Sequence, residues 1–506
     1  MNKKYILAID QGTSGTKTLV IDEQGKVHAK ATVPLKTYYH DNGFVEQVSE
    51  EIFQNVLSSV SKCIQSFTES GKSAKDILTC GISNQRETFI VWNKEGKPLY
   101  NAIVWQCKRS VDICERLKKQ DPEETIKQKT GLLIDPYFSG TKMMWLYEKT
   151  ETVRETVDAG NAYFGTVDSW LLYKLTKGKA YFTDYTNASR TLFFNLSTLT
   201  WDQELLAAIG LSKLNLPVCK PSSHHFGESD FDGLFEMSIP ITAMIGDSHA
   251  AAFGEGCFET GTAKATLGTG CSILMNIGEK IKYSGNGMVT TICWSTENIV
   301  RYAFEGVIVT CGASIEWLKN ELGLITDSKE TEAMATRVAD NQGVYLVPAF
   351  SGLGAPHWDM NRKASIHGLT FSANKNHIIR AALESIPYQI MDVIAAMKQD
   401  TKIELLQLMI DGGISSNHFI VQFLADLLNK PVVNIGIADV SALGAAYLAG
   451  LQKGLFESIE HLSKLNTDKK IFQPAMNSRM NEYYNGWKRA IHIDIAHQHE
   501  NETPIG

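Results

Sequence analysis

The stretch "ILAIDQGTSGTKTLVID" (residues 6–22) decides the fold, because it sets a turn rich in glycine and hydroxyl groups between two apolar segments. A P-loop would need Gly-Lys-Ser/Thr four residues after a glycine, and it would lead into a helix. Here only two residues separate Gly12 from Gly15, and Lys17 is followed by another alternating, β-branched segment. This pattern predicts strand, tight turn, strand. We therefore expect a hairpin whose tip is able to face phosphate.

Length and composition indicate a large globular protein with two domains. The chain has 506 residues, which is too many for one hydrophobic core. Hydrophobic residues make up 43% and charged residues 21%, as in ordinary soluble proteins. The net charge of -7 argues against a nucleic-acid binder that relies on a basic surface.

Cysteine usage and the N-terminus point to the cytoplasm. The nine cysteines include no CxxC pair, which predicts reduced thiols in a cytosolic enzyme. The first apolar run meets Asp10 too soon for a signal peptide. No apolar run approaches the roughly 18 residues that a membrane span needs.

Apolar periodicity predicts alternating strands and helices along the rest of the chain. Residues 50–67 repeat apolar side chains at helical spacing, and residues 76–93 read as strand, polar tip and strand. Residues 239–256 read as a strand that leads into a helix of small residues. Residues 261–278 read as a second hairpin, which echoes the opening one. A further helix of small residues, 439–451, is expected to pack closely against a neighbour.

Three glycine turns each end an apolar strand, at Gly12–Gly15, Gly268–Gly270 and Gly412–Gly413. Such turns expose backbone N–H groups without crowding by Cβ, which suits the oxygens of phosphate. A single turn of this kind is more often only structural. The three together favour a nucleotide-binding cleft.

Two carboxylates and one charged pair stand at strand ends. Asp10 is suited to hold Mg²⁺ or to cap the turn that follows it. Asp247 is suited to deprotonate a hydroxyl group or to cap the next helix. Arg86 and Glu87, at a polar tip, are suited to grip neighbouring hydroxyl groups by donating and accepting hydrogen bonds. The alternative for this pair is a solvated surface turn.

Motifs spread over nearly the whole chain are similar to those of the FGGY carbohydrate kinases. The resemblance rests on "ILAIDQGTSGT", "GISNQRETFIVWNKEGKPLYNAIVWQCKRS" (81–110), "YFSGTKMMWL" (137–146), "DYTNASRT" (184–191), "VPAFSGLGAPHW" (347–358), "ASIHGLTFSANKNHIIRAALE" (364–384) and "DGGISSN" (411–417). It implies an α/β fold of two ribonuclease-H-like domains of the actin/Hsp70 type, with the active site between them. Residues 1–250 would carry the phosphate hairpin and bind polyol, and residues 251–506 would bind the nucleotide.

The resemblance also implies an activity and its residues. The expected reaction is ATP- and Mg²⁺-dependent phosphorylation of a primary hydroxyl of a small polyol, with glycerol as the first candidate and sn-glycerol 3-phosphate as product. The alternatives are a longer polyol or a ketose (tetritol, pentitol, dihydroxyacetone, xylulose or ribulose), or a sugar sensor or ATPase scaffold without kinase activity. A homodimer or homotetramer is expected. The implied substrate-binding residues are Arg86, Glu87, Trp105, Tyr137, Ser248, Ser272 and Asp247, which is also the base; Asp10 is the metal residue. The implied nucleotide-binding residues are Thr13, Ser14, Lys17, Gly268, Thr269, Gly312, Glu316, Gly412, Gly413 and Asn417.

Four positions depart from the pattern of the family members that act on glycerol. Lys17 replaces an arginine, and Glu316 replaces a glutamine on the nucleotide side. Ser248 stands where those members have a glutamine that touches glycerol, and Ser272 stands where they have a phenylalanine. The two serines predict a roomier, more polar substrate pocket, in which His249 is another possible hydroxyl partner. The alternative is that side chains such as Trp105 or Met244 move in and restore a pocket of glycerol size.

Two regulatory features of some of those members are expected to be missing. The matching segment "GESDFDGLFEMSIP" (227–240) is acidic and contains no arginine, lysine or histidine. A bisphosphate would meet repulsion there instead of charge-assisted hydrogen bonds. We therefore expect neither inhibition by fructose 1,6-bisphosphate nor control by a phosphohistidine, although His224 and His225 lie just before the segment.

Overall fold

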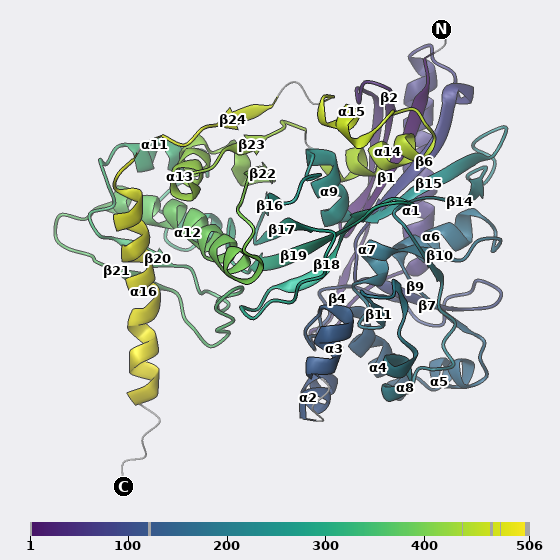
Figure 1. Ribbon diagram of the computed structural model, residues 1–506, viewed down its shortest axis with the longest axis horizontal. Coiled ribbons are helices and arrows are strands. Elements are labelled where there is room, and N and C mark those ends of the chain that lie inside the picture. The colour runs from purple at the N-terminus through teal and green to yellow at the C-terminus, as the bar shows by residue number, and fades with distance from the viewer. Residues whose placement is uncertain (1–2, 120–122, 438, 466–468, 476, 501–506) are drawn as a thin grey trace.

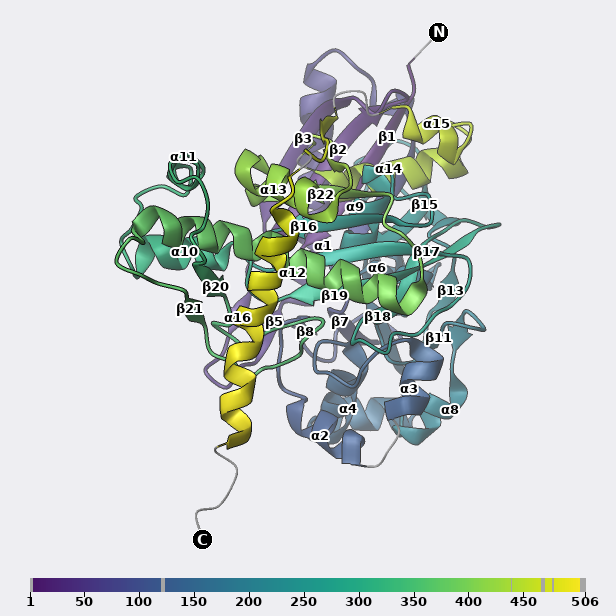
Figure 2. The same ribbon diagram turned by 60° about the vertical axis from the view of Figure 1, so that its left-hand side comes forward.

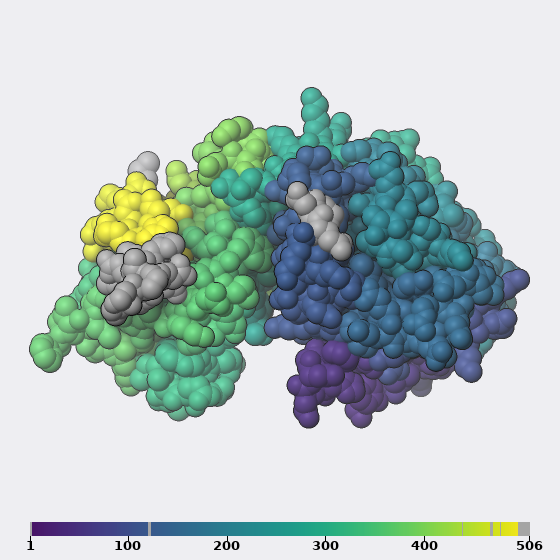
Figure 3. Space-filling model, turned by 90° about the horizontal axis from the view of Figure 1, so that it is seen from below, coloured from purple at the N-terminus to yellow at the C-terminus, as the bar shows by residue number. Residues whose placement is uncertain are grey.

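The chain forms two lobes, each built around a mixed β-sheet with helices packed against it (Figure 1). The computed structural model describes residues 3–119, 123–437, 439–465, 469–475 and 477–500, with side chains up to residue 493. Seen from below, the surface is notched between the blue N-terminal lobe and the green C-terminal lobe (Figure 3). This is the two-domain α/β architecture that the sequence predicts.

The first lobe contains a six-stranded sheet with the order β14-β15-β6-β1-β2-β3. Its strands are β1 (Tyr5–Gly12), β2 (Gly15–Asp22), β3 (Val27–Pro34), β6 (Ile77–Asn84), β14 (Ser223–Ser229) and β15 (Ile239–Gly246). Helix α1 (Ser49–Glu69) packs against β2 and β3. It buries the apolar face that the sequence predicts: Ile52, Val56, Val60, Cys63 and Phe67.

Strands β1 and β2 form the predicted hairpin. Gly12 pairs with Gly15 at its tip, and Asp10 lies opposite Lys17. A side chain is excluded at Gly15, because a Cβ there would lie 2.6 Å from the carbonyl oxygen of Val33 on β3. The glycine turn therefore leads into a strand that is sandwiched between two others, and not into the helix of a P-loop.

The second lobe repeats this arrangement in a seven-stranded sheet with the order β18-β19-β17-β16-β22-β23-β24. Strands β16 and β17 form an antiparallel hairpin, and β16 pairs in parallel with β22, as β1 does with β6. The two hairpins, which have similar sequence patterns, therefore also share the same strand pairing. The strands are β16 (Thr262–Leu267), β17 (Cys271–Gly278), β18 (Val289–Ser295), β19 (Val300–Ile308), β22 (Gln407–Asp411), β23 (Val432–Asn434) and β24 (Lys470–Phe472).

Helices cover both faces of the second sheet and extend away from it (Figure 2). The long α12 (Lys375–Thr401) contacts β17 and β19, and α13 (His418–Leu428) follows the turn after β22. Helix α10 (Ala313–Asn320) begins directly after the loop that follows β19. The C-terminal α16 (Met480–Glu500) runs along the outside of this lobe.

One strand–tip–strand prediction is wrong in its pairing. Strand β6 belongs to the first sheet, whereas β7 (Phe89–Asn93) belongs to a separate sheet with the order β4-β5-β8-β7-β9. The connecting residues cross between two sheets and do not form a hairpin tip. Arg86 is only 6% exposed and Glu87 only 2%, so the alternative of a solvated surface turn is also wrong. The other strands of this sheet are β4 (Tyr38–Tyr39), β5 (Val45–Gln47), β8 (Ala102–Ile103) and β9 (Ala162–Thr166).

Two helices of small residues join the lobes. Helix α9 (Asp247–Glu255) follows β15, and α14 (Val440–Gln452) packs against both α9 and the first sheet. A Cβ at Gly444 would lie 1.8 Å from the carbonyl oxygen of Ala250, and one at Gly81 would lie 2.2 Å from that of Ala445. The close packing that the sequence predicts for α14 therefore brings a late part of the chain onto the first lobe.

All nine cysteines are free thiols, and all but Cys219 are buried. Burial raises the pKa of the Cys63 thiol to about 12, so it stays protonated at neutral pH. Within the described residues, no helix is both long and apolar enough to cross a membrane.

Candidate active site

A cavity of about 300 Å³ lies between the two lobes. The lining residues include Thr13, Arg86, Glu87, Trp105 and Tyr137 of the first lobe and Asp247, Ser248 and Ala251 of α9. They also include Lys264, Thr266, Ser272 and Asp411 of the second sheet. All seven of the predicted substrate-binding residues therefore line one cavity. We call it the acceptor cavity.

A buried cluster of four charged side chains closes one wall of the acceptor cavity. Arg86 Nη1 lies 2.8 Å from Glu305 Oε1, and Arg190 Nη2 lies 2.6 Å from Glu305 Oε2. Arg190 Nε donates a hydrogen bond to Glu87 Oε1 over 2.7 Å. Although burial opposes its ionisation, Arg190 and Arg86 hold the pKa of Glu305 well below its usual range. Glu305 thus stays ionised, and its ion pairs hold Arg86 and Arg190 in place.

The aromatic wall is held by hydrogen bonds from two sides. The Trp105 indole N–H donates to the Thr13 hydroxyl over 2.9 Å, and its ring meets Tyr137 edge-on at 5.7 Å between centroids. Lys142, fully buried in α4 (Ser139–Lys149), donates to the carbonyl oxygens of Tyr137 at 2.8 Å and Trp105 at 3.3 Å. Burial lowers the pKa of Lys142 to about 8. Because Thr13 belongs to the hairpin tip, this wall links the acceptor cavity to the turn between β1 and β2.

The opposite wall is a row of polar side chains at one level of the second sheet. Ser272 on β17 is paired with Thr266 on β16, which is in turn paired with Asp411 on β22. Ser272 Oγ lies 3.3 Å from Glu305 Oε1, and Lys264 Nζ donates to Ser248 Oγ over 3.0 Å. The side of the cavity nearest the second lobe is therefore polar, with hydroxyl, ammonium and carboxylate groups.

Of the two side chains suggested to restore a pocket of glycerol size, Trp105 lines the cavity and Met244 does not. Met244 belongs to β15, is fully buried in the core of the first lobe and does not line the cavity. Trp105 stays on the wall of the first lobe, where Thr13 holds it. His249 is also fully buried, and neither ring nitrogen has a hydrogen-bond partner among the described residues. Burial and the nearby Arg86 lower its pKa well below the usual range, so it is neutral.

Asp247 has the environment of a base. It is the first residue of α9, and Gly246 takes the N-cap position, so Asp247 is not the N-cap. Its Oδ1 accepts a hydrogen bond from the backbone N–H of Ser248 over 2.6 Å and lies 3.5 Å from Arg86 Nε. Desolvation raises the pKa of Asp247, while Arg86 opposes that rise. A raised pKa makes the carboxylate a stronger proton acceptor.

The carboxylate of Asp10 interacts electrostatically with that of Asp247. Burial and then repulsion from Asp247 raise its pKa to about 6. Lys17 and a 3.1 Å hydrogen bond from Ser83 Oγ oppose the rise. Carboxylates that repel one another are of the kind that a hard divalent cation prefers as ligands.

A larger cavity of about 550 Å³ lies in the second lobe. We call it the glycine-lined cavity, because three of the predicted glycines form its walls. Gly312 tolerates no side chain, since a Cβ there would lie 2.8 Å from both the Gly268 carbonyl oxygen and Ile414 Cδ1. Six predicted nucleotide-binding residues line this cavity: Gly268, Thr269, Gly312, Glu316, Gly413 and Asn417.

The other predicted nucleotide-side residues lie elsewhere. Thr13 lines the acceptor cavity, and Ser14 is exposed at the hairpin tip. Lys17 lies with its Nζ 3.3 Å from Asp439 Oδ1, at the start of α14. Gly412 lines neither cavity, but its φ of 88° makes the turn after β22, as a glycine readily does. Asp10, the predicted metal residue, also lies outside the lining of both cavities.

Four functional candidates were missed in the sequence: Lys142, Arg190, Lys264 and Glu305. Two signals were available. Glu305 interrupts the apolar run "YAFEGVIV" and Lys264 stands between two alanines in "TAKATL", where a charge must be paired to be buried. Lys142 and Arg190 follow polar residues, in "SGTK" and "NASR", and gave no such signal.

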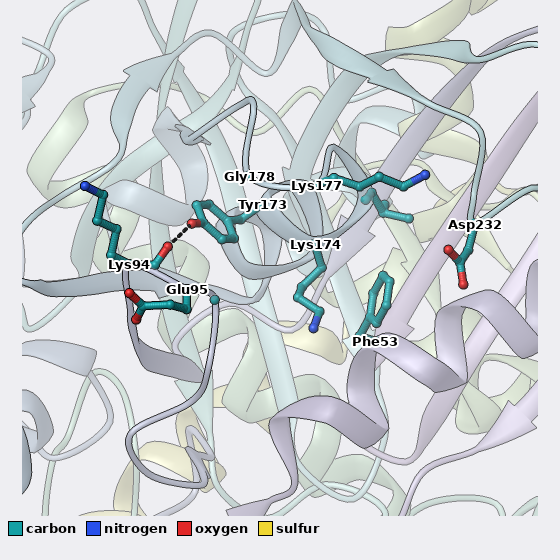
Figure 4. Close-up of a pocket in the computed structure, with 10 residues that line it drawn as sticks. Phe53, Lys94, Glu95, Tyr173, Lys174, Lys177, Gly178 and Asp232 are labelled. Carbon is teal, nitrogen blue, oxygen red and sulfur yellow. Dashed lines mark hydrogen bonds between the residues drawn. The ribbon is translucent and has the colours of Figure 1, made fainter.

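A third cavity, of about 410 Å³, lies beside the acidic segment 227–240 (Figure 4). It is lined by Lys94, Lys174 and Lys177, but these side chains point in different directions. Lys174 lies 3.0 Å from Glu50, and Lys177 lies 3.2 Å from Asp230. The lysines therefore do not converge on a site for phosphate.

A two-lobed α/β fold with a polar cavity between the lobes and a glycine-lined cavity in the second lobe is typical of a kinase that acts on small polyhydroxy compounds. The N-terminal domain model of the FGGY family of carbohydrate kinases matches residues 5–254, and the C-terminal domain model matches residues 263–452. The chain therefore belongs to the FGGY family of carbohydrate kinases.

Individual relatives are similar over nearly their whole length. The glycerol kinase of Alkaliphilus metalliredigens is 46% identical over 99% of this chain and 100% of its own. That of Bacillus licheniformis is 46% identical over 98% and 99%. The crystal structure of Plasmodium falciparum glycerol kinase with ADP superposes with a TM-score of 0.92 at 35% identity, and it covers 97% of this chain and 98% of that one. The protein is a glycerol kinase-like phosphotransferase.

Proposed function

We propose that this kinase transfers the γ-phosphoryl group of ATP to a primary hydroxyl of a small polyol, with glycerol as a substrate and sn-glycerol 3-phosphate as its product. The observation that carries the proposal is the acceptor cavity, in which Asp247 faces the hydroxyl-binding pair of Arg86 and Glu87. The full-length similarity to glycerol kinases supports the choice of glycerol.

In the proposed reaction, Arg86 donates hydrogen bonds to the polyol and Glu87 accepts them, while Trp105 packs along the carbon chain. Asp247 accepts the proton of the primary hydroxyl as its oxygen attacks the γ-phosphorus in line. The new O–P bond forms as the bond to the β,γ-bridging oxygen breaks, and ADP leaves with that electron pair. Backbone N–H groups at the turns of Thr13 and Thr269 would stabilise the charge on the transferred group.

Asp10 is the proposed residue for Mg²⁺, and Asp247 lies close enough for the two carboxylates to repel one another. A bound Mg²⁺ would supply charge neutralisation for the phosphate oxygens. The repulsion that raises the pKa of Asp10 is the property that supports this assignment, because a cation would relieve it.

In this proposal the two lobes bind different substrates. Residues 1–250 supply the phosphate hairpin and most of the acceptor cavity, and residues 251–506 supply the glycine-lined cavity for the nucleoside. Lys17 would face the phosphates only if its contact with Asp439 were exchanged for them. A homodimer or homotetramer stays a prediction.

The test is ADP release by the purified protein with ATP and Mg²⁺, in the presence and absence of glycerol. The proposal predicts release that depends on glycerol and follows saturation. Release at the same rate without any polyol would indicate an ATPase. No release with any polyol would indicate a sugar-binding protein without kinase activity. Either result would contradict the proposal.

A further inference from the structure

Strand β16 borders both the acceptor cavity and the glycine-lined cavity. Lys264 and Thr266, which lie two positions apart and so share a face of the strand, line the acceptor cavity. Leu267, the last residue of the strand, and Gly268, which follows it, line the glycine-lined cavity. In the proposed reaction the phosphoryl group leaves a nucleotide in the glycine-lined cavity and reaches an acceptor beside Asp247. The side chains of β16 that face the acceptor cavity therefore lie close to its path.

The side chain of Lys264 is buried and ends beside the proposed base. Only 2% of Lys264 is exposed, because β16 packs against α9 (Figure 1). Its Nζ donates a hydrogen bond to Ser248 Oγ over 3.0 Å. The backbone N–H of the same serine donates to the carboxylate of Asp247. Ser248 thus holds the ammonium of Lys264 on one side and the carboxylate of Asp247 on the other.

The ammonium of Lys264 has a hydroxyl partner but no carboxylate partner. A buried lysine is normally paired with an anion, because an isolated charge is costly to bury. Across the residues that the structure describes, Lys264 forms no ion pair, and Ser248 is the one hydrogen-bond partner of its Nζ. Arg86, which also lines the cavity, lies 2.8 Å from Glu305 Oε1 and 3.5 Å from Asp247 Oδ1. Lys264 is therefore the lining cation with N–H bonds to offer to an incoming anion.

The charge of this ammonium favours a phosphoryl oxygen over a polyol hydroxyl as its ligand. A polyol is neutral, and in the proposed function Arg86 and Glu87 already bind its hydroxyl groups. A phosphoryl group in transfer carries negative charge on its three equatorial oxygens. Lysine binds phosphate as a compact point charge. The carboxylate of Asp247 would repel those oxygens, and a cation held beside it would offset that repulsion.

From this geometry we infer that Lys264 is a further catalytic residue, whose ammonium contacts an equatorial oxygen of the phosphoryl group during its transfer. The inference rests on the proposed function, since it concerns the same reaction. Lys264 keeps its proton throughout, so the bonds that form and break are those already given. Ser248 is then a positioning residue, which holds the ammonium toward the cavity.

The first test is the steady-state kinetics of Lys264→Gln, which removes the charge and keeps a polar side chain. Loss of one group that stabilises charge in the transition state is expected to lower kcat about 10²–10³-fold. The KM values for glycerol and ATP are expected to change by less than about threefold, because the contact forms during transfer. Lys282→Gln is the matched control, since Lys282 donates to the Thr401 carbonyl oxygen outside the lining of both cavities. It should behave as the wild type.

The second test uses the unmodified protein and an ATP analogue that carries an acyl group on its γ-phosphate. A lysine amine that lies at the γ-phosphate attacks the acyl carbonyl carbon and becomes acylated, and ATP leaves. Mass spectrometry after proteolysis is expected to find the acyl group on Lys264, and excess ATP is expected to prevent the labelling. Acylation of other lysines, such as Lys17, without Lys264 would overturn the inference.

The outcomes separate this inference from the proposed function. If the wild type phosphorylates glycerol and Lys264→Gln keeps kcat within about threefold of it, the inference is wrong and the proposed function stands. If the variant raises the KM for glycerol about tenfold or more at an unchanged kcat, Lys264 holds the polyol and the inference is also wrong. If the wild type phosphorylates no polyol, both are wrong. If Lys264→Gln does not fold, the labelling of the unmodified protein decides the matter.

Discussion

The two cavities of this protein are built in opposite ways. The acceptor cavity is lined by charged side chains from distant segments, held by the buried cluster of Arg86, Arg190 and Glu305. The glycine-lined cavity is formed by backbone turns, and its shape depends on positions where no side chain fits, such as Gly312. In the proposed function, the acceptor cavity would recognise its ligand through fixed charges, and the glycine-lined cavity through room for the ligand beside the backbone.

This difference explains which ligand each cavity suits. A polyol offers hydroxyl groups that both donate and accept hydrogen bonds, so it needs side chains of both characters in a fixed arrangement. A nucleotide offers a flat base and anionic oxygens, for which exposed N–H groups and a smooth surface are sufficient. The comparison predicts that the loss of a charge damages the acceptor cavity and spares the glycine-lined cavity. An added side chain at a glycine of the second cavity should have the reverse effect.

The largest expected effect comes from Asp247. Asp247→Asn keeps the shape of the side chain and removes the proton acceptor, so turnover should fall by about 10²–10⁴-fold. The KM for ATP should stay nearly unchanged, because Asp247 does not line the glycine-lined cavity. Steady-state kinetics at saturating polyol provides the measurement. Near-normal turnover would exclude Asp247 as the base.

Breaking the charged cluster should damage the acceptor cavity alone. Glu305→Gln leaves Arg86 and Arg190 without their shared carboxylate, and breaking a buried pair typically costs about 3–5 kcal/mol. The expected results are a lower melting temperature and a KM for polyol raised about 10–100-fold, since each tenfold change corresponds to about 1.4 kcal/mol. The KM for ATP serves as the internal reference.

The matched control is Glu279→Gln, which removes an exposed ion pair with Arg301. Exposed pairs contribute little, so this variant should behave as the wild type. If Glu305→Gln raised both KM values equally, the separation between the two cavities would be lost.

A steric change should have the reverse selectivity. In Gly312→Ala the added Cβ would lie 2.8 Å from the Gly268 carbonyl oxygen, and relief of such overpacking typically costs about 1–3 kcal/mol. We expect the KM for ATP to rise about tenfold with little change in the KM for polyol. Gly285→Ala is the control, because its Cβ would make an ordinary contact at 3.6 Å. An unchanged KM for ATP would argue against Gly312 as part of the nucleotide site.

Asp10 should show a smaller effect, on stability. Its pKa in the folded protein is about 6, above the ordinary value of 3.8. The folded state therefore holds this proton more tightly than the unfolded state, and the free energy of unfolding decreases as the pH rises from about 4 to about 6. Asp10→Asn removes this loss, so the ligand-free variant should melt a few degrees higher than the wild type at pH 7 and equally at pH 4.

Thermal unfolding without Mg²⁺ between pH 4 and pH 8 measures this difference. Asp41→Asn, in an exposed loop, is the control. A variant that melts lower than the wild type at pH 7 would show that Asp10 is a structural cap and not a strained ligand residue.

The third cavity should give no effect at all. Lys174 and Lys177 are already paired with Glu50 and Asp230, and the neighbouring segment is acidic. Millimolar fructose 1,6-bisphosphate should leave the rate of phosphoryl transfer unchanged. Saturable inhibition would show that this surface binds a bisphosphate in spite of its charges. Activation by a phosphotransferase-system phosphocarrier would likewise contradict the expected absence of phosphohistidine control.

Sequence patterns were sufficient for the parts of the fold that depend on local signals. The hairpin of β1 and β2, its echo in β16 and β17, and the buried face of α1 all follow from periodicity and glycine spacing. The same patterns did not reveal that β6 and β7 join different sheets. Periodicity reports which face of a strand is buried, but it carries no information about which strand lies alongside.

The acceptor cavity was predictable only in part for the same reason. Arg86 and Glu87 were visible as a charged pair, yet their burial depends on Arg190 and Glu305, which lie far along the chain. Resemblance to the family brought Trp105 and Tyr137 into the site, but not the Lys142 ammonium group that holds their carbonyl oxygens. Long-range charge pairing of this kind is a property of the folded protein, because a local pattern can mark a buried charge such as Glu305 but cannot name its partner.

The most direct test of the central claim is the fate of the γ-phosphoryl group, followed by ³¹P NMR with ATP, Mg²⁺ and glycerol. The account predicts that ADP and a phosphomonoester on a primary carbon of glycerol appear in equal amounts. It also predicts that Asp247→Asn slows both equally. Inorganic phosphate in place of the ester, or ADP formed in excess over the ester, would contradict phosphoryl transfer to a polyol at this site.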